Sequence, residues 1–132
     1  MKKLSYVILA FVIISISSCA DKGHNVYTSI KGSWRCEEFN PLSGSSNYIV
    51  VIDRKLNDTT QYLLSNFENV NYEEFVFAQL TKNNLTISEQ QIGTEIVKSG
   101  KGVVSANFTR IDLNYTIFDG QTEVKVQAIY SR

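Results

Sequence analysis

The chain has 132 residues, of which 43% are apolar and 20% charged, a composition typical of one globular domain. Thirteen Lys and Arg residues balance thirteen Asp and Glu residues, so there is no basic excess with which to bind the phosphates of a nucleic acid. One His and two Cys residues make a zinc site or a disulfide framework hard to assemble. We therefore expect no nucleic-acid partner, no metal and no cofactor.

The first 18 residues have the pattern of a secretory signal peptide. Lys2 and Lys3 precede an apolar run at 4–16, whose thirteen residues fall short of the roughly 20 that span a bilayer. A retained transmembrane helix is the alternative interpretation. The sequence Ile-Ser-Ser-Cys at 16–19 resembles the bacterial lipobox, in which the Cys becomes the lipidated N-terminus. The resemblance implies that Cys19 is acylated and that its lipid holds the protein at a membrane of the cell envelope.

Ala20, which follows the lipobox-like Cys, favours the outer membrane by analogy with lipoprotein sorting and leaves the leaflet open. Residues 19–29 are polar and turn-prone, which suits a tether between the lipid and a folded domain at 30–132. The single His, His24, lies in this tether, where we expect neither a metal ligand nor a general base. Once Cys19 is acylated, Cys36 is the remaining thiol, so an intramolecular disulfide is excluded.

After Ile30 the sequence consists of short β-rich runs, and no window of twelve or more residues carries a helical stripe. We predict an all-β domain whose eight strands lie at Ser33–Asn40, Asn47–Arg54, Thr60–Phe67, Glu74–Thr81, Leu85–Glu89, Glu95–Val104, Phe108–Phe118 and Thr122–Ser131. The connections are mostly of hairpin length, so consecutive strands should pair as an antiparallel meander.

The last predicted hairpin has the strongest turn signal, because Asp119-Gly120 is flanked by alternating strands. A two-residue turn there sets Leu113 opposite Val126 and Ile111 opposite Ala128. Apolar residues then share one face of the hairpin, and a slip of one residue would expose them all. One face of the hairpin should therefore be buried and the other wet.

The turn at Lys82-Asn83-Asn84 points Phe75 and Phe77 towards the outside of the predicted sheet. Two aromatic rings two residues apart would form an exposed patch there. A loop such as Glu68–Tyr72 that covers them is the commoner explanation.

Gly32-Ser33-Trp34 opens the first predicted strand, and Tyr130-Ser131-Arg132 ends the last. This combination is similar to the calycin superfamily, which includes the lipocalins. The phrases at 85–87 with Gln90, at 100–102 and at 115–120 resemble small lipocalin-like lipoproteins of the kind common in Bacteroidota. The resemblance implies a meander barrel of about eight strands in which Arg132 packs across Trp34 at the closed end. The chain lacks the further motifs, disulfides and C-terminal helix of lipocalins, so ligand transport does not follow from the resemblance.

An eight-stranded barrel is just wide enough to be filled by side chains or to hold one small ligand. The bulky residues Trp34, Tyr48, Tyr62, Tyr115 and Tyr130 favour a filled interior. The alternative is a carrier of a small hydrophobic molecule, with a lumen lined by Val50, Ile52, Leu113, Val126 and Ala128.

Catalytic groups are hard to assemble from this sequence. Most carboxylates alternate outward on strands or lie in turns, and the predicted domain has no His to activate a nucleophile. We therefore expect a non-catalytic binding or interaction module, with a hydrolase as the remotest alternative. The rival functions are the hydrophobic carrier and a protein-binding accessory or inhibitor, whose partner would contact the outer face at Phe75 and Phe77.

Overall fold

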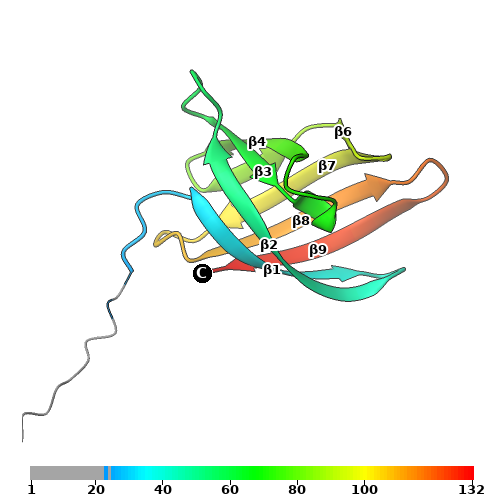
Figure 1. Cartoon of the computed structure of the whole chain (residues 1–132), viewed down its shortest axis with the longest axis horizontal. Helices are drawn as coiled ribbons and strands as arrows, with labels where there is room; N and C mark the ends of the chain where they lie inside the picture. The colour runs from blue at the N-terminus through cyan, green and yellow to red at the C-terminus, as the bar shows by residue number, and fades with distance from the viewer. Residues whose placement is uncertain (1–22, 24) are drawn as a thin grey trace, which may run out of the picture.

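Nine β-strands joined by short loops build the domain (Figure 1). The computed structural model describes Gly23 and residues 25–132, so the predicted signal peptide, Cys19 and His24 lie outside the described residues. The strands are β1 (Gly32–Asn40), β2 (Gly44–Arg54), β3 (Gln61–Ser65), β4 (Phe75–Thr81), β5 (Asn84–Ile87), β6 (Gln90–Ile92), β7 (Glu95–Val104), β8 (Arg110–Phe118) and β9 (Glu123–Ser131).

The sheet closes on itself into a barrel. Neighbouring strands pair antiparallel in the order β5-β4-β3-β2-β1-β9-β8-β7, and a further pairing between β5 and β7 joins the two ends. Eight strands thus form the closed meander, and β6 is an extra strand paired with β7 alone. The predicted all-β barrel is confirmed, with β6 as an addition that its polar Gln90-Gln91 sequence did not signal.

Helical structure is minor in the described residues. The 3-10 turn η1 (Phe67–Asn69) follows β3, and no described helix has the length and apolar character that a membrane crossing requires. Alternate side chains along the strands are buried, as in the pattern of β9, where Val124, Val126, Ala128 and Tyr130 all point inward. This period of two is the reason that the sheet has one apolar and one wet face.

The register of the last hairpin differs from the prediction. Phe118 pairs with Glu123 and Leu113 with Ala128, so the loop has four residues and every partner is displaced by two positions. The Asp119 carboxylate accepts hydrogen bonds from the backbone N–H groups of Gln121 and Thr122, at 2.8 and 2.7 Å, and so stabilises the longer loop. Because the displacement is even, the same side chains stay inside the barrel.

One end of the barrel is sealed around Arg132. Its guanidinium carbon lies 4.1 Å from the centre of the Trp34 ring and 3.9 Å from that of Tyr27. The same group donates hydrogen bonds to the carbonyl oxygens of Phe108, Lys31 and Ser29, the first two at 2.7 and 2.6 Å. This end, which we call the closed end, is therefore covered by a cation held between two rings and three carbonyls.

The Trp34 ring lies directly beneath the Arg132 guanidinium. Its ring is 0% exposed, and its indole N–H donates to the Ile30 carbonyl oxygen at 2.8 Å. Gly32, two residues earlier, has φ 123°, and a Cβ added there would lie 3.1 Å from the Arg132 guanidinium. A side chain at this position would be strained and would crowd the cover, so glycine is required.

Replacement of Trp34 by Ala should lower the free energy of unfolding by roughly 3–5 kcal/mol, because it removes a fully buried ring and leaves a cavity beneath Arg132. Urea denaturation followed by far-ultraviolet circular dichroism measures the loss. Leu42→Ala, at a hairpin position that is 69% exposed, is the matched control and should change stability by less than about 0.5 kcal/mol. A Trp34→Ala protein as stable as this control would contradict the sealed end.

Candidate functional site

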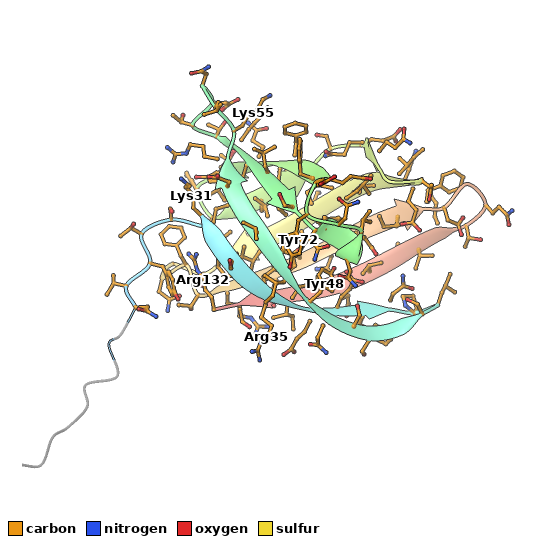
Figure 2. The ribbon with its side chains drawn as sticks, in the orientation of Figure 1. Lys31, Arg35, Tyr48, Lys55, Tyr72 and Arg132 are labelled. Carbon is orange, nitrogen blue, oxygen red and sulfur yellow. The ribbon has the colours of Figure 1, made fainter. Side chains whose placement is uncertain are left out.

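Polar side chains collect inside the barrel, away from the closed end. Tyr48 lies well along β2 from the end of the barrel that holds Arg132, as Figure 2 shows. The group, which we call the interior polar cluster, consists of Cys36 and Glu38 from β1, Tyr48 from β2, Glu68 from η1, Tyr115 from β8 and Tyr130 from β9. It draws on five elements that are far apart in the sequence.

The pleat of β1 puts a carboxylate in the core. Trp34, Cys36 and Glu38 are alternate residues of that strand, and all three are buried. Small residues on neighbouring strands provide the room, because Ala128 pairs with Glu38 and Gly100 pairs with Tyr115. A Cβ at Gly100 would lie 3.2 Å from the Cβ of Tyr115, so glycine lets this ring pack against β7.

The Glu38 carboxylate is the centre of the hydrogen bonding. The hydroxyl groups of Tyr48 and Tyr115 both donate to its Oε2, the latter at 2.5 Å, and the Ser46 hydroxyl donates to Oε1 at 3.4 Å. Glu38 is only 6% exposed. A buried carboxylate is thus held by phenols and a hydroxyl, and no cationic side chain of residues 25–132 donates to it.

Two oxygen atoms of the cluster have no hydrogen-bond partner. They are Oε1 of Glu68 and the hydroxyl oxygen of Tyr130, whose side chain is 0% exposed. Buried polar atoms are nearly always paired, because an unpaired one forfeits its hydrogen bonds to water. The cluster therefore has capacity for a further donor.

The segment at 66–74, which we call the mouth loop, covers this part of the barrel. Its Phe67 is fully buried and packs on Tyr115 with ring centres 4.7 Å apart. The Asn66 amide donates to the Ile49 carbonyl on β2 at 2.9 Å, and the Glu74 carboxylate accepts from the backbone N–H of Gly93 between β6 and β7. The loop is thus fastened to opposite sides of the barrel.

Strain is concentrated in the same loop. Asn66, Glu68 and Asn69 have φ values of 60°, 57° and 56°, in the left-handed region that residues other than glycine rarely adopt. The packing of Phe67 beneath the loop offsets the cost of this backbone. Because Glu68 lies in a loop, no strand pleat sets its direction. The strained turn instead points its side chain towards the cluster.

The pKa values in the cluster are governed by burial. Burial raises the pKa of Glu68 to about 7, opposed by the Tyr115 hydroxyl and reinforced by the carboxylates of Glu38 and Glu95. Burial also raises the pKa of the Cys36 thiol to about 12. The pKa values of Tyr48, Tyr115 and Tyr130 are raised for the same reason, so the thiol and the phenols keep their protons at neutral pH.

This arrangement suits hydrogen bonding better than covalent chemistry. A thiol that stays protonated is a poor nucleophile, and a carboxylate held by two phenols is not free to act as a base. In the part of the chain that the structure describes, no three His, Cys, Asp or Glu side chains gather as metal ligands would.

The residues proposed from the sequence to line a cavity all point inward. Val50, Ile52, Leu113, Val126 and Ala128 are all buried in the core, where Ala128 lies between Glu38 on β1 and Leu113 on β8. The hollow over β7, β8 and β9, with a volume of about 420 Å³, is lined mainly by outward-facing side chains such as Lys101 and Gln127. Whether the inward set encloses a ligand stays a prediction.

Phe75 and Phe77 lie on the outer wall, 43% and 39% exposed. Their rings meet edge to face with centres 5.3 Å apart, and the Lys55 ammonium lies 5.1 Å from the Phe77 ring centre. The expectation that the loop Glu68–Tyr72 covers them is wrong, because both rings remain exposed while Glu68 of this loop turns into the barrel. The aromatic pair is thus left open to solvent.

Sequence reasoning missed Glu38 and Glu68 as interior residues. For Glu38 a signal existed, since it shares the parity of Trp34, which the resemblance to calycins places in the core. For Glu68 there was none, because a residue in a loop has no periodicity that says which way it points.

Comparison of the chain with protein-family models and with curated proteins finds no match in either set.

The pKa of Glu68 makes stability depend on pH. The carboxyl group keeps its proton in the folded barrel up to about pH 7 but loses it near 4.5 in the unfolded chain. The folded state binds more protons between these values, so the free energy of unfolding should fall by roughly 1–3 kcal/mol as pH rises from 5 to 8.

Glu68→Gln should remove this dependence and make the protein more stable than the wild type at pH 8. Urea denaturation at both pH values measures the effect. Glu73→Gln, at an exposed position of the same loop, is the matched control and should keep the wild-type slope. Equal slopes for all three proteins would refute the burial of a protonated Glu68.

Proposed function

We propose that the chain is a lipid-anchored, lipocalin-like module of the bacterial cell envelope that binds a small ligand at the mouth of its barrel without transforming it. The observation that carries this proposal is the contrast between the two ends. Arg132 covers one end, with each of its three guanidinium nitrogens donating to a carbonyl and its plane against two rings. Beneath the mouth loop lie two hydrogen-bonding oxygens without partners. The mouth is therefore the end equipped to receive a ligand.

The barrel supports the lipocalin-like part of the proposal. Eight antiparallel strands close in sequence order, and the Gly-Ser-Trp phrase stands at the start of β1. Arg132 from the end of the chain covers Trp34, the contact that the resemblance to calycins implies. The fully buried rings of Trp34, Phe67 and Tyr130 favour an interior occupied largely by side chains over the open lumen of a hydrophobic carrier.

The path of the described N-terminal segment indicates which end of the barrel an anchor at Cys19 would hold. Tyr27 packs on Arg132, and Ser29 offers its carbonyl to the same guanidinium, so the chain joins the barrel at its closed end (Figure 2). A lipid at Cys19 would then hold the closed end towards the membrane and turn the mouth away from it. This orientation leaves the proposed ligand site accessible from the aqueous compartment.

Replacement of Cys19 by Ala should move the protein from the membrane fraction to the soluble fraction, because no acyl chains can then be attached. Cell fractionation followed by immunoblotting measures the change. Cys36→Ala, which removes the buried thiol, is the matched control and should stay with the membranes. A Cys19→Ala protein that remains fully membrane-bound would contradict the anchor.

Ala128→Phe separates a filled barrel from a hydrophobic carrier. In a filled barrel the added ring has no space beside Glu38 and should lower the free energy of unfolding by roughly 1–3 kcal/mol. In a carrier it would occupy a void and leave stability unchanged or higher. Urea denaturation followed by the fluorescence of the single Trp decides between them, with Ala106→Phe on an exposed loop as control.

A further inference from the structure

We propose that the interior polar cluster binds a primary ammonium group carried by a small organic molecule. This inference rests on the proposed function and names the chemical class of the ligand. Charge, hydrogen bonding and the aromatic surroundings of the cluster each point to the same group.

The charge of the cluster calls for a positive partner. The ionisable groups that interact electrostatically with Glu68 and its neighbours are acids, phenols and a thiol: Cys36, Glu37 and Glu38 on β1, Tyr48 on β2, Glu95 on β7, Tyr115 on β8 and Tyr130 on β9. Within residues 25–132 no Lys, Arg or His belongs to this set. One buried and one half-buried carboxyl group are costly to ionise together without a counter-charge, so the site favours uptake of a proton or a cation.

The unpaired oxygens identify the kind of cation. Tyr130 is fully buried, its hydroxyl has no hydrogen-bond partner, and burial together with the nearby Cys36, Glu38 and Glu68 raises its pKa. Oε1 of Glu68 also lacks a partner. A primary ammonium carries three N–H donors on one small centre, which is enough donors for both oxygens. A quaternary ammonium has no N–H to offer and would leave them unpaired.

Aromatic rings complete the surroundings of the site. Phe67 and Tyr115 stack on each other, and Tyr48 reaches the same Glu38 oxygen as Tyr115. An ammonium among such rings is attracted by their π faces in addition to the carboxylates. A hard metal cation such as Ca²⁺ is a poorer fit, because it takes six to eight oxygen ligands and the cluster offers only two carboxylates.

Access to the site is through the mouth. Tyr48 and Glu68 are half-buried, whereas Glu38 and Tyr130 behind them are buried. The ammonium would therefore enter past Tyr48 and Glu68, and its organic body would remain under the mouth loop.

Binding should displace a proton. Below about pH 7 the Glu68 carboxyl group carries a proton in the empty site. When the ammonium enters, that O–H bond breaks, the proton goes to solvent and the carboxylate accepts an N–H from the ligand. An alkylammonium keeps its own charge in this range, so affinity should rise about tenfold between pH 6 and pH 8.

The test is isothermal titration calorimetry on the full-length chain in a non-ionic detergent, with titrations into empty micelles as blanks. Three probes share a phenyl ring and differ in the head group: 2-phenylethylammonium, 2-phenylethanol and 3-phenylpropanoate. Each is measured at pH 6 and pH 8, in two buffers that differ in ionisation enthalpy. We expect saturable binding of the ammonium alone, tighter at pH 8 and with a proton released at pH 6.

Two variants locate the binding. Glu68→Gln should weaken binding of the ammonium at least about tenfold at pH 8 and abolish both the pH dependence and the proton release. Tyr130→Phe should weaken it about fivefold and keep the pH dependence, since only one hydrogen bond is lost. Glu73→Gln is the matched control on the same loop and should behave as the wild type.

Other results would overturn the inference in distinguishable ways. If the alcohol or the carboxylate binds as tightly as the ammonium, the ligand is not a cation, and the proposed binding at the mouth still stands. If the ammonium binds equally well to Glu68→Gln, its site lies elsewhere and this inference fails alone. If none of the three probes binds, the cluster holds only a proton, and both the inference and the proposed function fail.

Discussion

Pairing of β1 with β9 is the constraint on which the rest of the structure depends. It joins the first strand to the last, and with the β5–β7 pairing it completes a closed barrel whose alternating side chains have an inside and an outside. Trp34, Cys36 and Glu38 then share the interior because they are alternate residues of one strand. The same strand therefore supplies the ring that seals one end of the barrel and the carboxylate that organises the other. A slip of one residue in this pairing would exchange the two faces.

The closed end and the mouth of the barrel differ in how their charged groups are stabilised. At the closed end the Arg132 guanidinium lies against two rings and donates to three carbonyls, and the Trp34 ring that it covers is fully buried. Towards the mouth, phenol hydroxyls stabilise the Glu38 carboxylate. Burial raises the pKa of Glu68, and one of its carboxyl oxygens has no hydrogen-bond partner. Stability is thus concentrated at one end, and the strained mouth loop holds acidic groups at the other. Such a division is common where a rigid scaffold supports a binding site.

Much of the fold was predictable because local signals agreed with one another. Runs of alternating residues separated by short turns indicate a meander, and the strand from Glu95 to Val104 has the predicted bounds. The last hairpin shows the limit of such signals, since Asp119-Gly120 suits a two-residue turn, yet the Asp119 side chain stabilises a four-residue loop. The predicted register was wrong by two residues, an even number, so the partners of Leu113 and Ala128 changed while both side chains stayed on the same face.

By itself, the sequence determined the all-β class, the burial of one face of each long strand and the identities of the two residues that meet at the closed end. These follow from periodicity and from a resemblance carried by Trp34 and Arg132. Only the tertiary structure decided that Glu38 and Glu68 belong to the same interior polar cluster, where Glu38 helps to raise the pKa of Glu68. The physical reason is that a carboxylate is expected in water, whether it lies on a strand or in a loop. Phenols from distant strands offset the burial of Glu38, and the packing of Phe67 draws the mouth loop with Glu68 inward.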